Sequence, residues 1–255
     1  MFTIGADPEL FLKNQNNKLI SVVGLIGGTK ESPLPIGNGC AIQEDNVAAE
    51  FCIPACNNPK AFISSIQFAI QDIQSRAEDL GLTLAKLTAS ASFDKDQLQT
   101  RAARQFGCDP DYNAYTDKPN PRPRAEDRTL RSAGGHVHVG TTLPPRDIIK
   151  TMDLLLGVPS VLIDSDEQRR KLYGKAGCFR YKPYGVEYRT LSNFWIWDER
   201  TIDWVYHQVA ESINFCEEFI KESSEEEQLL IQSCINDNNK EYATKLIDKW
   251  SIAIP

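Results

Sequence analysis

The sequence lacks the patterns that mark membrane and secreted proteins. No apolar run approaches the roughly 20 residues that a membrane-spanning helix needs. The first residues carry no basic stretch followed by an apolar one, so we expect no signal peptide. These absences predict a cytoplasmic protein with no membrane partner.

Basic charge is in the minority. The chain has 28 lysine and arginine residues against 35 aspartate and glutamate residues, a formal net charge of −7 and an isoelectric point near 5.1. An acidic chain is repelled by nucleic acid and by anionic lipid, so no nucleic-acid partner is expected. With 41% hydrophobic and 25% charged residues, the composition is that of an ordinary folded globular protein. No repeat or low-complexity linker interrupts the sequence, which favours one domain over residues 1–255.

Paired cysteine motifs are also absent. The seven cysteines are scattered, and only Cys52 and Cys56 lie close together, with no second pair to complete a zinc site. Their odd number and irregular spacing favour free thiols in a reducing cytoplasm. The sequence therefore disfavours both a zinc site and a disulfide framework.

Two helical regions have clear sequence signals. Asn58 and Pro59 suit the start of a helix, an apolar stripe at helical spacing follows, and Gly81 suits the end. The C-terminal third also has a helical pattern, in which Ser224 and Glu227 fit a capping box. We predict a helix over residues 59–80 and a helical C-terminal segment from about residue 198.

The rest of the pattern indicates strands joined by irregular segments. Extended chain is expected over residues 1–12 (interrupted at Pro8), 18–23, 41–53, 82–89, 129–140 and 186–194. Short helices are expected over residues 95–106 and 146–156, and loops over residues 24–39 and 107–127. Because helices do not alternate regularly with these strands, a doubly wound sheet or a TIM barrel is disfavoured. The sequence predicts an α+β fold with a mainly antiparallel sheet and helices packed on one face.

Acidic residues and histidines recur at two-residue spacing on the predicted strands. Side chains at positions i and i+2 of a strand face the same way. This rule groups Asp7 with Glu9, His136 with His138, Glu187 with Arg189, and Glu44 with Asn46 and Glu50. The residues expected on the opposite face, which would pack on helices, are Val137, Val139 and Val186.

A sheet face with several carboxylates repels itself unless cations bind there. Mg²⁺ and Mn²⁺ prefer carboxylate oxygen, and Mn²⁺ also accepts an imidazole. Each motif has an ordinary explanation when taken alone, because Glu-x-Arg is usually a surface ion pair and Asp-Pro-Glu is usually a turn. Together, in this order along the chain, the motifs favour a divalent-metal site.

These motifs resemble those of the carboxylate–amine ligase (amidoligase) type 2 family of phage-encoded proteins, in the glutamine synthetase and glutamate–cysteine ligase superfamily. The resemblance covers most of residues 2–195. It rests on residues 5–11 (GADPELF), 27–30 (GGTK), 45–51 (DNVAAEF), 106–112 (FGCDPDY), 133–138 (AGGHVH), 173–177 (YGKAG) and 184–189 (YGVEYR). The segment after about residue 198 carries no matching motif. The resemblance implies a glutamine-synthetase-like catalytic fold.

The resemblance also implies roles for particular residues. In glutamine-synthetase-like enzymes, glutamates and a strand histidine hold the metals, and an arginine two residues after the last glutamate meets the phosphate. Carried over, the metal ligands are Asp7, Glu9, Glu44, Glu50, His136 and Glu187, and the arginine is Arg189. The middle element departs from the superfamily pattern, because Glu44 and Glu50 are closer together than expected and Asp45 competes with Glu44.

The implied reaction joins a carboxylate to an amine and depends on ATP and on Mg²⁺ or Mn²⁺. The γ-phosphoryl group would convert the carboxylate into an acyl phosphate, which the amine then attacks. Arg189 and one or more of Arg170, Lys175 and Arg180 would bind phosphate or carboxylate; otherwise the last three are a solvated helix end. Lys175 lies between two glycines, on a segment that could close over nucleotide. The expected catalytic residues are Glu50, Glu187, Arg189 and His138, of which His138 could touch substrate or metal.

Two further segments could bind phosphate or substrate but are also explained as ordinary loops. Residues 27–30 lack the glycine and lysine spacing of a phosphate-binding loop, so we expect a turn-rich loop at the edge of the site. Residues 120–124 (NPRPR) form a basic patch that could hold an acidic substrate, although such a patch is more often a solvated loop.

Two rival functions stay open on the same fold. One is a guanidino (phosphagen-type) kinase, and the other is a nonenzymatic phage accessory or binding protein. Retention of nearly every expected ligand disfavours the second, since a scaffold need not keep a costly cluster of buried charges. The substrates are left open and include a peptide, a protein side chain, a polyamine or a small metabolite, and an oligomer is possible. A phage-encoded protein would act in the cytoplasm of the infected cell.

Overall fold

The structure is a computed structural model that describes residues 2–104, 111–121 and 126–255. The strands are β1 (Thr3–Ala6), β2 (Glu9–Leu10), β3 (Leu12–Lys13), β4 (Leu19–Ile20), β5 (Leu34–Gly37), β6 (Cys40–Asp45), β7 (Ala48–Cys52), β8 (Thr83–Leu84), β9 (Ser90–Ser92), β10 (Tyr112–Asn113), β11 (Lys118–Pro119), β12 (Leu130–Ser132), β13 (Val137–Gly140), β14 (Cys178–Lys182) and β15 (Gly185–Tyr188). The α-helices are α1 (Pro59–Asp79), α2 (Arg101–Arg104), α3 (Pro145–Met152), α4 (Val158–Ile163), α5 (Glu167–Leu172), α6 (Glu199–Glu222), α7 (Glu225–Asn236) and α8 (Lys240–Trp250). A π-helical turn η2 (Asp153–Gly157) joins α3 to α4, and two 3₁₀ helices are η1 (Lys95–Leu98) and η3 (Asn193–Trp197).

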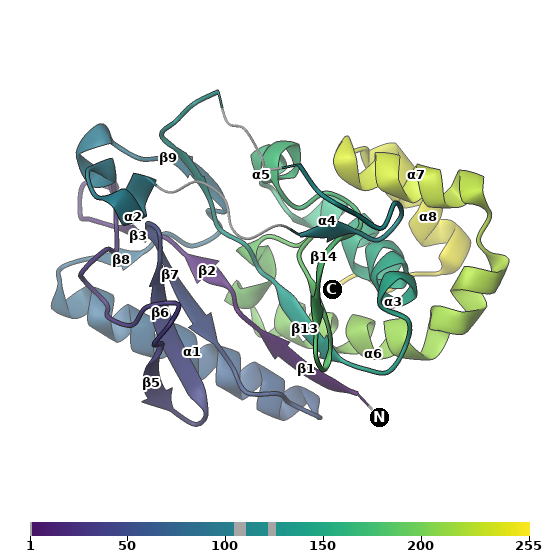
Figure 1. The fold of residues 1–255 in the computed structure, drawn as a ribbon, viewed down its shortest axis with the longest axis horizontal. Coiled ribbons are helices and arrows are strands. Elements are labelled where there is room, and N and C mark those ends of the chain that lie inside the picture. Colours follow the sequence, from purple (N-terminus) through teal and green to yellow (C-terminus); the bar gives the residue numbers. More distant parts are fainter. Residues whose placement is uncertain (1, 105–110, 122–125) are drawn as a thin grey trace.

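Two antiparallel sheets carry the polar residues singled out by the sequence. The larger sheet has the strand order β1-β13-β15-β14-β10-β11, and the smaller one has the order β2-β7-β6-β5 (Figure 1). Each strand pairing in the described ranges is antiparallel. The predicted α+β class with mainly antiparallel pairing is confirmed, and its glutamine-synthetase-like version stays a prediction.

The larger sheet buries one face against helices. Val137, Val139 and Val186 are fully buried, as their alternation predicted, and Ile4 and Tyr188 are buried with them. Helix α3 packs on β14 and β15, while α6 packs on both α3 and α1. The helices therefore cover the apolar face, and the opposite face of these strands carries the polar residues.

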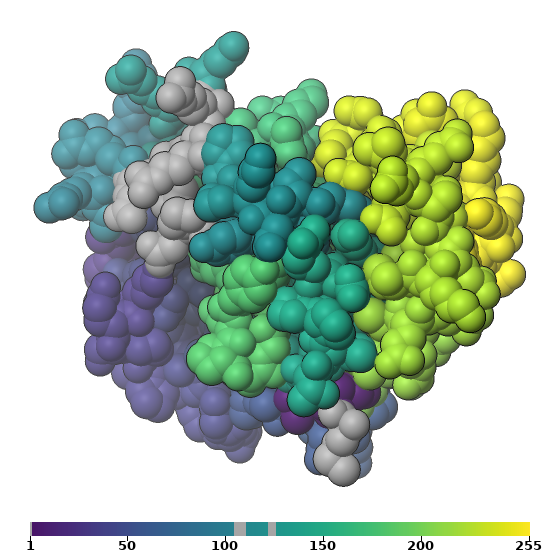
Figure 2. All heavy atoms as spheres, turned by 45° about the vertical axis from the view of Figure 1, so that its right-hand side comes forward, coloured from purple at the N-terminus to yellow at the C-terminus, as the bar shows by residue number. Residues whose placement is uncertain are grey.

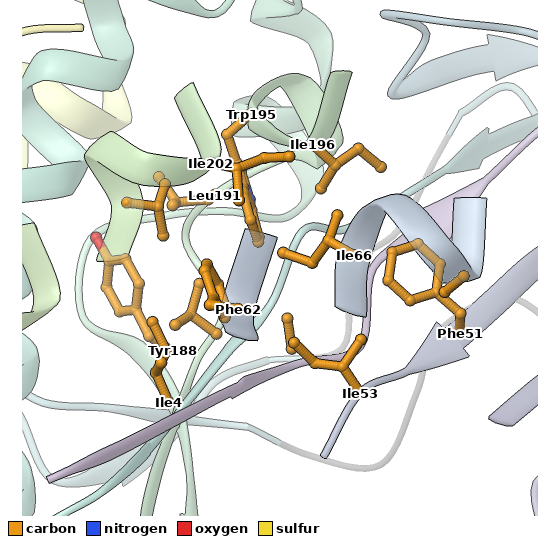
Figure 3. Close-up of a cluster of buried hydrophobic side chains, with 14 of the residues drawn as sticks. Ile4, Phe51, Ile53, Phe62, Ile66, Tyr188, Leu191, Trp195, Ile196 and Ile202 are labelled. Carbon is orange, nitrogen blue, oxygen red and sulfur yellow. The ribbon is translucent and has the colours of Figure 1, made fainter. Parts of the chain in front are cut away.

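Helix α1 connects the two sheets through a shared core. It lies along β6 and β7 of the smaller sheet. Its first turn is capped by Asn58 Oδ1, which accepts a hydrogen bond of 2.9 Å from Ala61 N. Phe62 and Ile66 project from α1 into the core, where the Phe62 ring stacks on Trp195 at a centroid distance of 5.9 Å (Figure 3). The predicted helix over residues 59–80 is confirmed to within one residue.

Several predicted strands are divided or shortened. Residues 41–53 form the hairpin β6–β7, because Asn46 adopts a left-handed conformation (φ 56°) that turns the chain. Residues 24–39 are not wholly a loop, since they contain β5. Residues 129–140 are divided at Gly134 and Gly135, where a Cβ would lie 2.3 Å from His136 Nε2 and 2.2 Å from Ser192 O, respectively. Only glycine allows the backbone this close an approach.

Other predicted elements are shorter than expected or partly outside the described residues. The strands expected over residues 18–23, 82–89 and 186–194 shrink to β4, β8 and β15. The helix expected over residues 146–156 begins as α3 and continues as η2. Residues 95–104 form η1 and α2. The last two residues of this predicted helix lie outside the described residues, and so do residues 107–110 and 122–125 of the predicted loop.

The C-terminal third is helical, as the sequence predicted. Ser224 caps α7, with its Oγ accepting a hydrogen bond of 3.2 Å from Glu227 N. Helices α7 and α8 pack together with α4 around a second apolar core. Figure 2 shows these helices covering one end of the molecule. None of the helices in the described ranges is both long enough and apolar enough to cross a membrane.

Candidate active site

Three adjacent strands, β13, β15 and β14, place polar residues in one row across the larger sheet. His138 of β13 pairs with Gly5 of β1 on one side and with Glu187 of β15 on the other. Glu187 in turn pairs with Arg180 of β14. Because the side chains of successive residues in a strand point to opposite faces, this row lies on the face opposite the buried Val139 and Val186.

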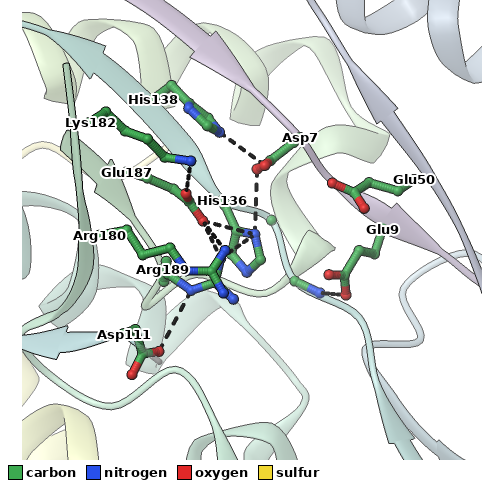
Figure 4. A network of polar contacts seen from close by, with 12 residues as sticks. Asp7, Glu9, Glu50, Asp111, His136, His138, Arg180, Lys182, Glu187 and Arg189 are labelled. Carbon is green, nitrogen blue, oxygen red and sulfur yellow. Dashed lines mark hydrogen bonds and ion pairs between the residues drawn. The ribbon is translucent and has the colours of Figure 1, made fainter. Parts of the chain in front are cut away.

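Asp7 contacts both histidines directly after β1. Its Oδ1 lies 3.4 Å from His136 Nδ1, and its Oδ2 lies 3.0 Å from His138 Nε2 (Figure 4). Burial alone would raise the pKa of Asp7, but hydrogen bonds with the two imidazoles outweigh it and hold the pKa well below its usual value. Burial and the charge of Arg189 lower the pKa of His136 to about 4. At neutral pH Asp7 is therefore an anion beside an uncharged His136, which suits both of them as metal ligands.

Glu187 is fully buried among cationic side chains. Its Oε2 lies 2.6 Å from Lys182 Nζ, and its Oε1 accepts hydrogen bonds from Arg189 and, at 3.4 Å, from Arg180. Burial raises the pKa of Glu187, but the charge of Arg189, with smaller contributions from His136 and Arg180, lowers it to about 2. Lys182 was not indicated by any sequence motif, although it lies on the same strand as Arg180.

Glu9 extends the site into the smaller sheet. It pairs with Glu50 of β7, and its Oε2 accepts a hydrogen bond of 2.7 Å from Gly134 N. Glu50 pairs with Gln43 of β6, whose Nε2 donates to Glu50 Oε2 at 2.8 Å. Asp45 lies two residues beyond Gln43 on the same strand and therefore shares its face. Glu9, Asp45 and Glu50 form a carboxylate cluster.

The carboxylate cluster is unfavourable without a cation. Burial and the charge of Asp45 raise the pKa of Glu9 to about 7. Burial also raises the pKa of Asp45 and, together with the charges of neighbouring carboxylates, raises that of Glu50 well above its usual value. One oxygen from each of the three side chains lies within 4.8 Å of the others. This donor set fits Mg²⁺ or Mn²⁺, which prefer carboxylate oxygen.

A second group of potential ligands consists of Asp7, His138 and Glu187. One ligand atom from each lies within 4.8 Å of the others. The mixture of oxygen and nitrogen suits Mn²⁺ better than Ca²⁺. Unlike the carboxylate cluster, this group already has Lys182 and Arg180 beside Glu187 to balance its charge. The carboxylate cluster is therefore the better-supported metal site of the two.

Three buried arginines line a cavity beside the carboxylate cluster, which we call the arginine cavity. They are Arg131, Arg169 and Arg189, which are 5%, 3% and 6% exposed. The cavity is lined by these arginines and by Glu9, Asp45, Asn46, Val47, Ala48, Asp111, Ser132, Gly134, His136, Tyr173 and Gly174. The Nε of Arg169 is buried and has no hydrogen-bond partner among the described residues. Guanidinium groups at such a site can bind phosphate or carboxylate through forked hydrogen bonds.

Glu44 does not reach the site. It faces away from Glu50, because the turn at Asn46 makes Glu50 pair with Gln43 and not with Glu44. Its carboxylate instead accepts three backbone hydrogen bonds, of 2.6, 3.0 and 2.9 Å, from Gly24, Ile26 and Gly27. The prediction that Glu44 shares the metal-binding face is therefore wrong. Asp45 takes its place.

Three of the predicted phosphate-binding residues do not line the arginine cavity, and one of them, Arg180, contacts Glu187 instead. Arg170 points toward Ser160 Oγ at 3.0 Å and Asp164 Oδ2 at 3.7 Å, where it forms a buried contact outside the arginine cavity. Its neighbour Arg169 lines the cavity instead, because successive helical positions point in different directions. The side chain of Lys175 is exposed and does not line the cavity, although Gly174 does.

Two motif segments fall partly outside the described residues. Of residues 106–112, only Asp111 and Tyr112 are described, and Asp111 Oδ2 lies 3.6 Å from Arg189 Nε. In the basic patch at residues 120–124, both predicted arginines lie outside the described residues. Burial raises the pKa of Asp45, and the charge of Lys30, in the loop at residues 27–30, opposes this rise.

A buried aspartate behind the site was not indicated by the sequence. Asp153 of η2 accepts hydrogen bonds of 2.8 Å from Tyr188 Oη, 3.0 Å from Tyr115 Oη and 2.6 Å from Gly177 N. Burial raises the pKa of Asp153 to about 7, although these hydrogen bonds act in the opposite direction. Thr190 Oγ1, next to Arg189, contacts it at 3.3 Å. Asp153 thus fixes the backbone on both sides of the arginine cavity.

A second cavity lies beside His138, and we call it the tyrosine cavity. It is lined by Thr3, Gly5, Ala6, Asp7, Cys52, Ile53, Ala55, His138, Gly140 and Tyr184. Tyr184 Oη lies 2.5 Å from His138 Nδ1, and the tyrosine side chain is half exposed. Cys52 is the exposed cysteine of those described. The two cavities meet the site at different residues, Asp7 in one and Glu9 in the other.

Comparison with known proteins identifies one family. The model of the phage phiEco32-like COOH.NH2 ligase-type 2 family matches residues 129–245, slightly less than half of the chain. The matched range includes His136, His138, Glu187 and Arg189. It also includes α6 and α7, which carried no recognisable motif in the sequence. A search of curated proteins gave no match.

Proposed function

Because residues 129–245 match the model of the phage phiEco32-like COOH.NH2 ligase-type 2 family, we propose that the chain is a carboxylate–amine ligase that uses ATP and Mg²⁺ or Mn²⁺. The observation that carries this proposal is the lining of the arginine cavity, which combines three buried arginines with Glu9 and Asp45 of the carboxylate cluster. A site for divalent ions beside a site for oxyanions is what a metal–nucleotide complex requires. As a phage-encoded protein it would act in the cytoplasm of the infected cell.

The proposed reaction has two steps. An oxygen of the substrate carboxylate attacks the γ-phosphorus of ATP, the bond to the β-phosphate oxygen breaks, and ADP leaves. The amine nitrogen then attacks the carbonyl carbon of the acyl phosphate, the bond between this carbon and the phosphate oxygen breaks, and the nitrogen loses a proton. The products are an amide, ADP and phosphate. Catalysis of such a transfer depends mainly on positioning and on stabilisation of charge.

The residues of the site have distinct proposed roles. Glu9, Asp45 and Glu50 hold a divalent ion, which would reduce the negative charge of the phosphates as a Lewis acid. Arg189, held by Glu187 and by Asp111 at 3.6 Å, binds a transferring phosphoryl group or the substrate carboxylate. Arg131 and Arg169 join it in place of the predicted Arg170 and Lys175. His136 lines the arginine cavity, whereas Asp7 and His138 line the tyrosine cavity.

The first test is calorimetric titration of the protein with ATP in the presence and absence of Mg²⁺. We expect binding that requires the ion and falls by about 100-fold in Glu187→Gln and in His136→Ala, because each change removes a charge or a ligand at the centre of the site. The matched controls are Glu241→Gln and His207→Ala, which alter exposed residues on α8 and α6. If the folded protein binds no ATP with Mg²⁺ and none with Mn²⁺, the proposal is ruled out.

A second measurement separates the ligase from a guanidino kinase. Carboxylates are screened with ATP and hydroxylamine, because hydroxylamine captures an acyl phosphate as a hydroxamate. A ligase gives hydroxamate and ADP in equal amounts, whereas a kinase acting on a guanidino group gives ADP without hydroxamate. Formation of hydroxamate has to disappear in Glu187→Gln.

A further inference from the structure

The lining of the tyrosine cavity differs in charge from that of the arginine cavity. Among its described lining residues, the tyrosine cavity has no lysine or arginine. Its one carboxylate is that of Asp7. An anion placed there would meet negative charge, whereas a cation would be attracted.

From this contrast we propose that the tyrosine cavity binds the amine substrate, as a primary ammonium group on an unbranched aliphatic chain. Asp7 and the hydroxyl group of Tyr184 are the polar partners for the ammonium group, which has three N–H donors. Ala6, Ile53 and Ala55 form an apolar wall for the aliphatic chain. The identification of this cation as a substrate rests on the proposed ligase function, but its binding does not.

The position of the tyrosine cavity suits an amine that reacts with a group held in the arginine cavity. Asp7 lines the tyrosine cavity and Glu9 lines the arginine cavity, with only Pro8 between them. Likewise, His136 lines the arginine cavity and His138 lines the tyrosine cavity, and Asp7 contacts both histidines. The two cavities therefore adjoin at the contact between Asp7 and His136, so an amine and an anionic partner can occupy them together.

The test uses Cys52, which lies in the lining of the tyrosine cavity, as a reporter. The reagent is 4,4′-dithiodipyridine, a neutral disulfide that exchanges with thiolates, releases thiopyridone and does not react with amines. It is applied to the full-length protein at about pH 8.5, because burial raises the pKa of the Cys52 thiol while hexylamine is still a cation. The rate of Cys52 modification is measured alone and with hexylamine, hexanoate or hexanol. We expect saturating hexylamine to slow the reaction at least five-fold, and hexanoate and hexanol to slow it less than two-fold. A Cys52→Ser variant identifies any signal from other cysteines.

Two variants connect protection to the cavity. Ala55 is exposed, so Ala55→Trp can cover the opening without disturbing the core, and Ala55→Ser is its conservative control. Protection is the ratio of the Cys52 reaction rates without and with hexylamine, measured within each variant. It has to be lost in Ala55→Trp and kept in Ala55→Ser. Equal protection by hexanoate, or no protection by hexylamine, would overturn the inference.

The outcomes separate this inference from the proposed function. If ATP binds with Mg²⁺ but hexylamine does not protect Cys52, the amine site is wrong and the ligase proposal stands. If hexylamine protects Cys52 but ATP does not bind with either ion, the cation site stands and the ligase proposal fails.

Discussion

The arginine cavity and the tyrosine cavity adjoin where His136 of the first contacts Asp7 of the second, but they differ in their charged residues. Three buried arginines line the first together with Glu9, Asp45 and Asp111, whereas Asp7 is the one carboxylate of the second, whose described lining has no lysine or arginine. A ligase has to bring together two reactants of opposite charge that would otherwise form an unreactive salt. Under the proposed function, the difference between the cavities would let one site hold the two reactants apart until one of them is activated.

A short stretch of backbone produces this difference. Asp7 follows β1 in the larger sheet, and Glu9 begins β2 in the smaller sheet, so the chain changes sheets at Pro8. Proline fits here because it cannot donate a ladder hydrogen bond and therefore favours an interruption between strands. The two acidic residues consequently serve different cavities, although the sequence suggested that they share one face.

The largest expected effect concerns the arginine cavity. Arg189→Lys keeps the charge but loses the forked geometry, so we expect ATP affinity in the presence of Mg²⁺ to fall by about 100-fold. Arg180→Lys is the matched control, because Arg180 contacts Glu187 but does not line the cavity. Calorimetry should show a change of less than about three-fold for this control. Equal losses in both variants would contradict the placement of the anion.

A smaller effect tests the assignment of Asp45 in place of Glu44. Asp45→Asn should weaken Mn²⁺ binding by at least about 10-fold, a cost typical for the loss of groups that support a metal. Glu44→Gln should leave Mn²⁺ affinity unchanged and lower the free energy of unfolding by about 1–3 kcal/mol, because an amide cannot replace a carboxylate that accepts three backbone hydrogen bonds. Mn²⁺ titration and urea unfolding measure the two effects. A reversed pattern would restore Glu44 as the ligand.

The smallest effect is a dependence of metal stabilisation on pH. The folded protein holds a proton on Glu9 up to a pKa of about 7, whereas an unperturbed glutamate releases it near 4.5. The stability that this proton provides is present below pH 4.5 and is lost as the pH rises through 7. A divalent ion binds the deprotonated form, so Mn²⁺ should raise the melting temperature by about 2–4 °C more at about pH 8 than at about pH 6. Glu9→Gln should remove most of this difference, and an unchanged difference would exclude Glu9 as its source.

Local patterns predicted much of this structure. Alternation along β13 and β15 correctly separated the buried valines from His138 and Glu187, because one face of each strand packs on helices. Asn58 and Ser224 marked true helix starts, since a side-chain oxygen at those positions satisfies a free backbone N–H. The motifs at Asp7 and Glu9 also led to the site.

The remainder depended on turns and on tertiary contacts. Asn46 has no glycine beside it to mark a hairpin, so the reversal of side-chain parity between Glu44 and Asp45 was not visible in the sequence. Arg169 and Arg170 are chemically identical neighbours, and only the packing of α5 decides which one faces the cavity. Arg131 carried no motif at all, because its place depends on β12 pairing with the distant β9.

The hydrogen bond between Asn236 Oδ1 and Ala176 N, at 2.9 Å, has a consequence for shortened versions of the chain. Ala176 lies in the turn that also contains Gly174 of the arginine cavity, and its side chain packs in the apolar core beneath α4, α7 and α8. Truncation at about residue 198 would leave that turn without its anchor and would expose the buried Leu154 and Val161 to water. A minimal active fragment therefore has to keep α7 and α8, even though the recognisable motifs all end before them.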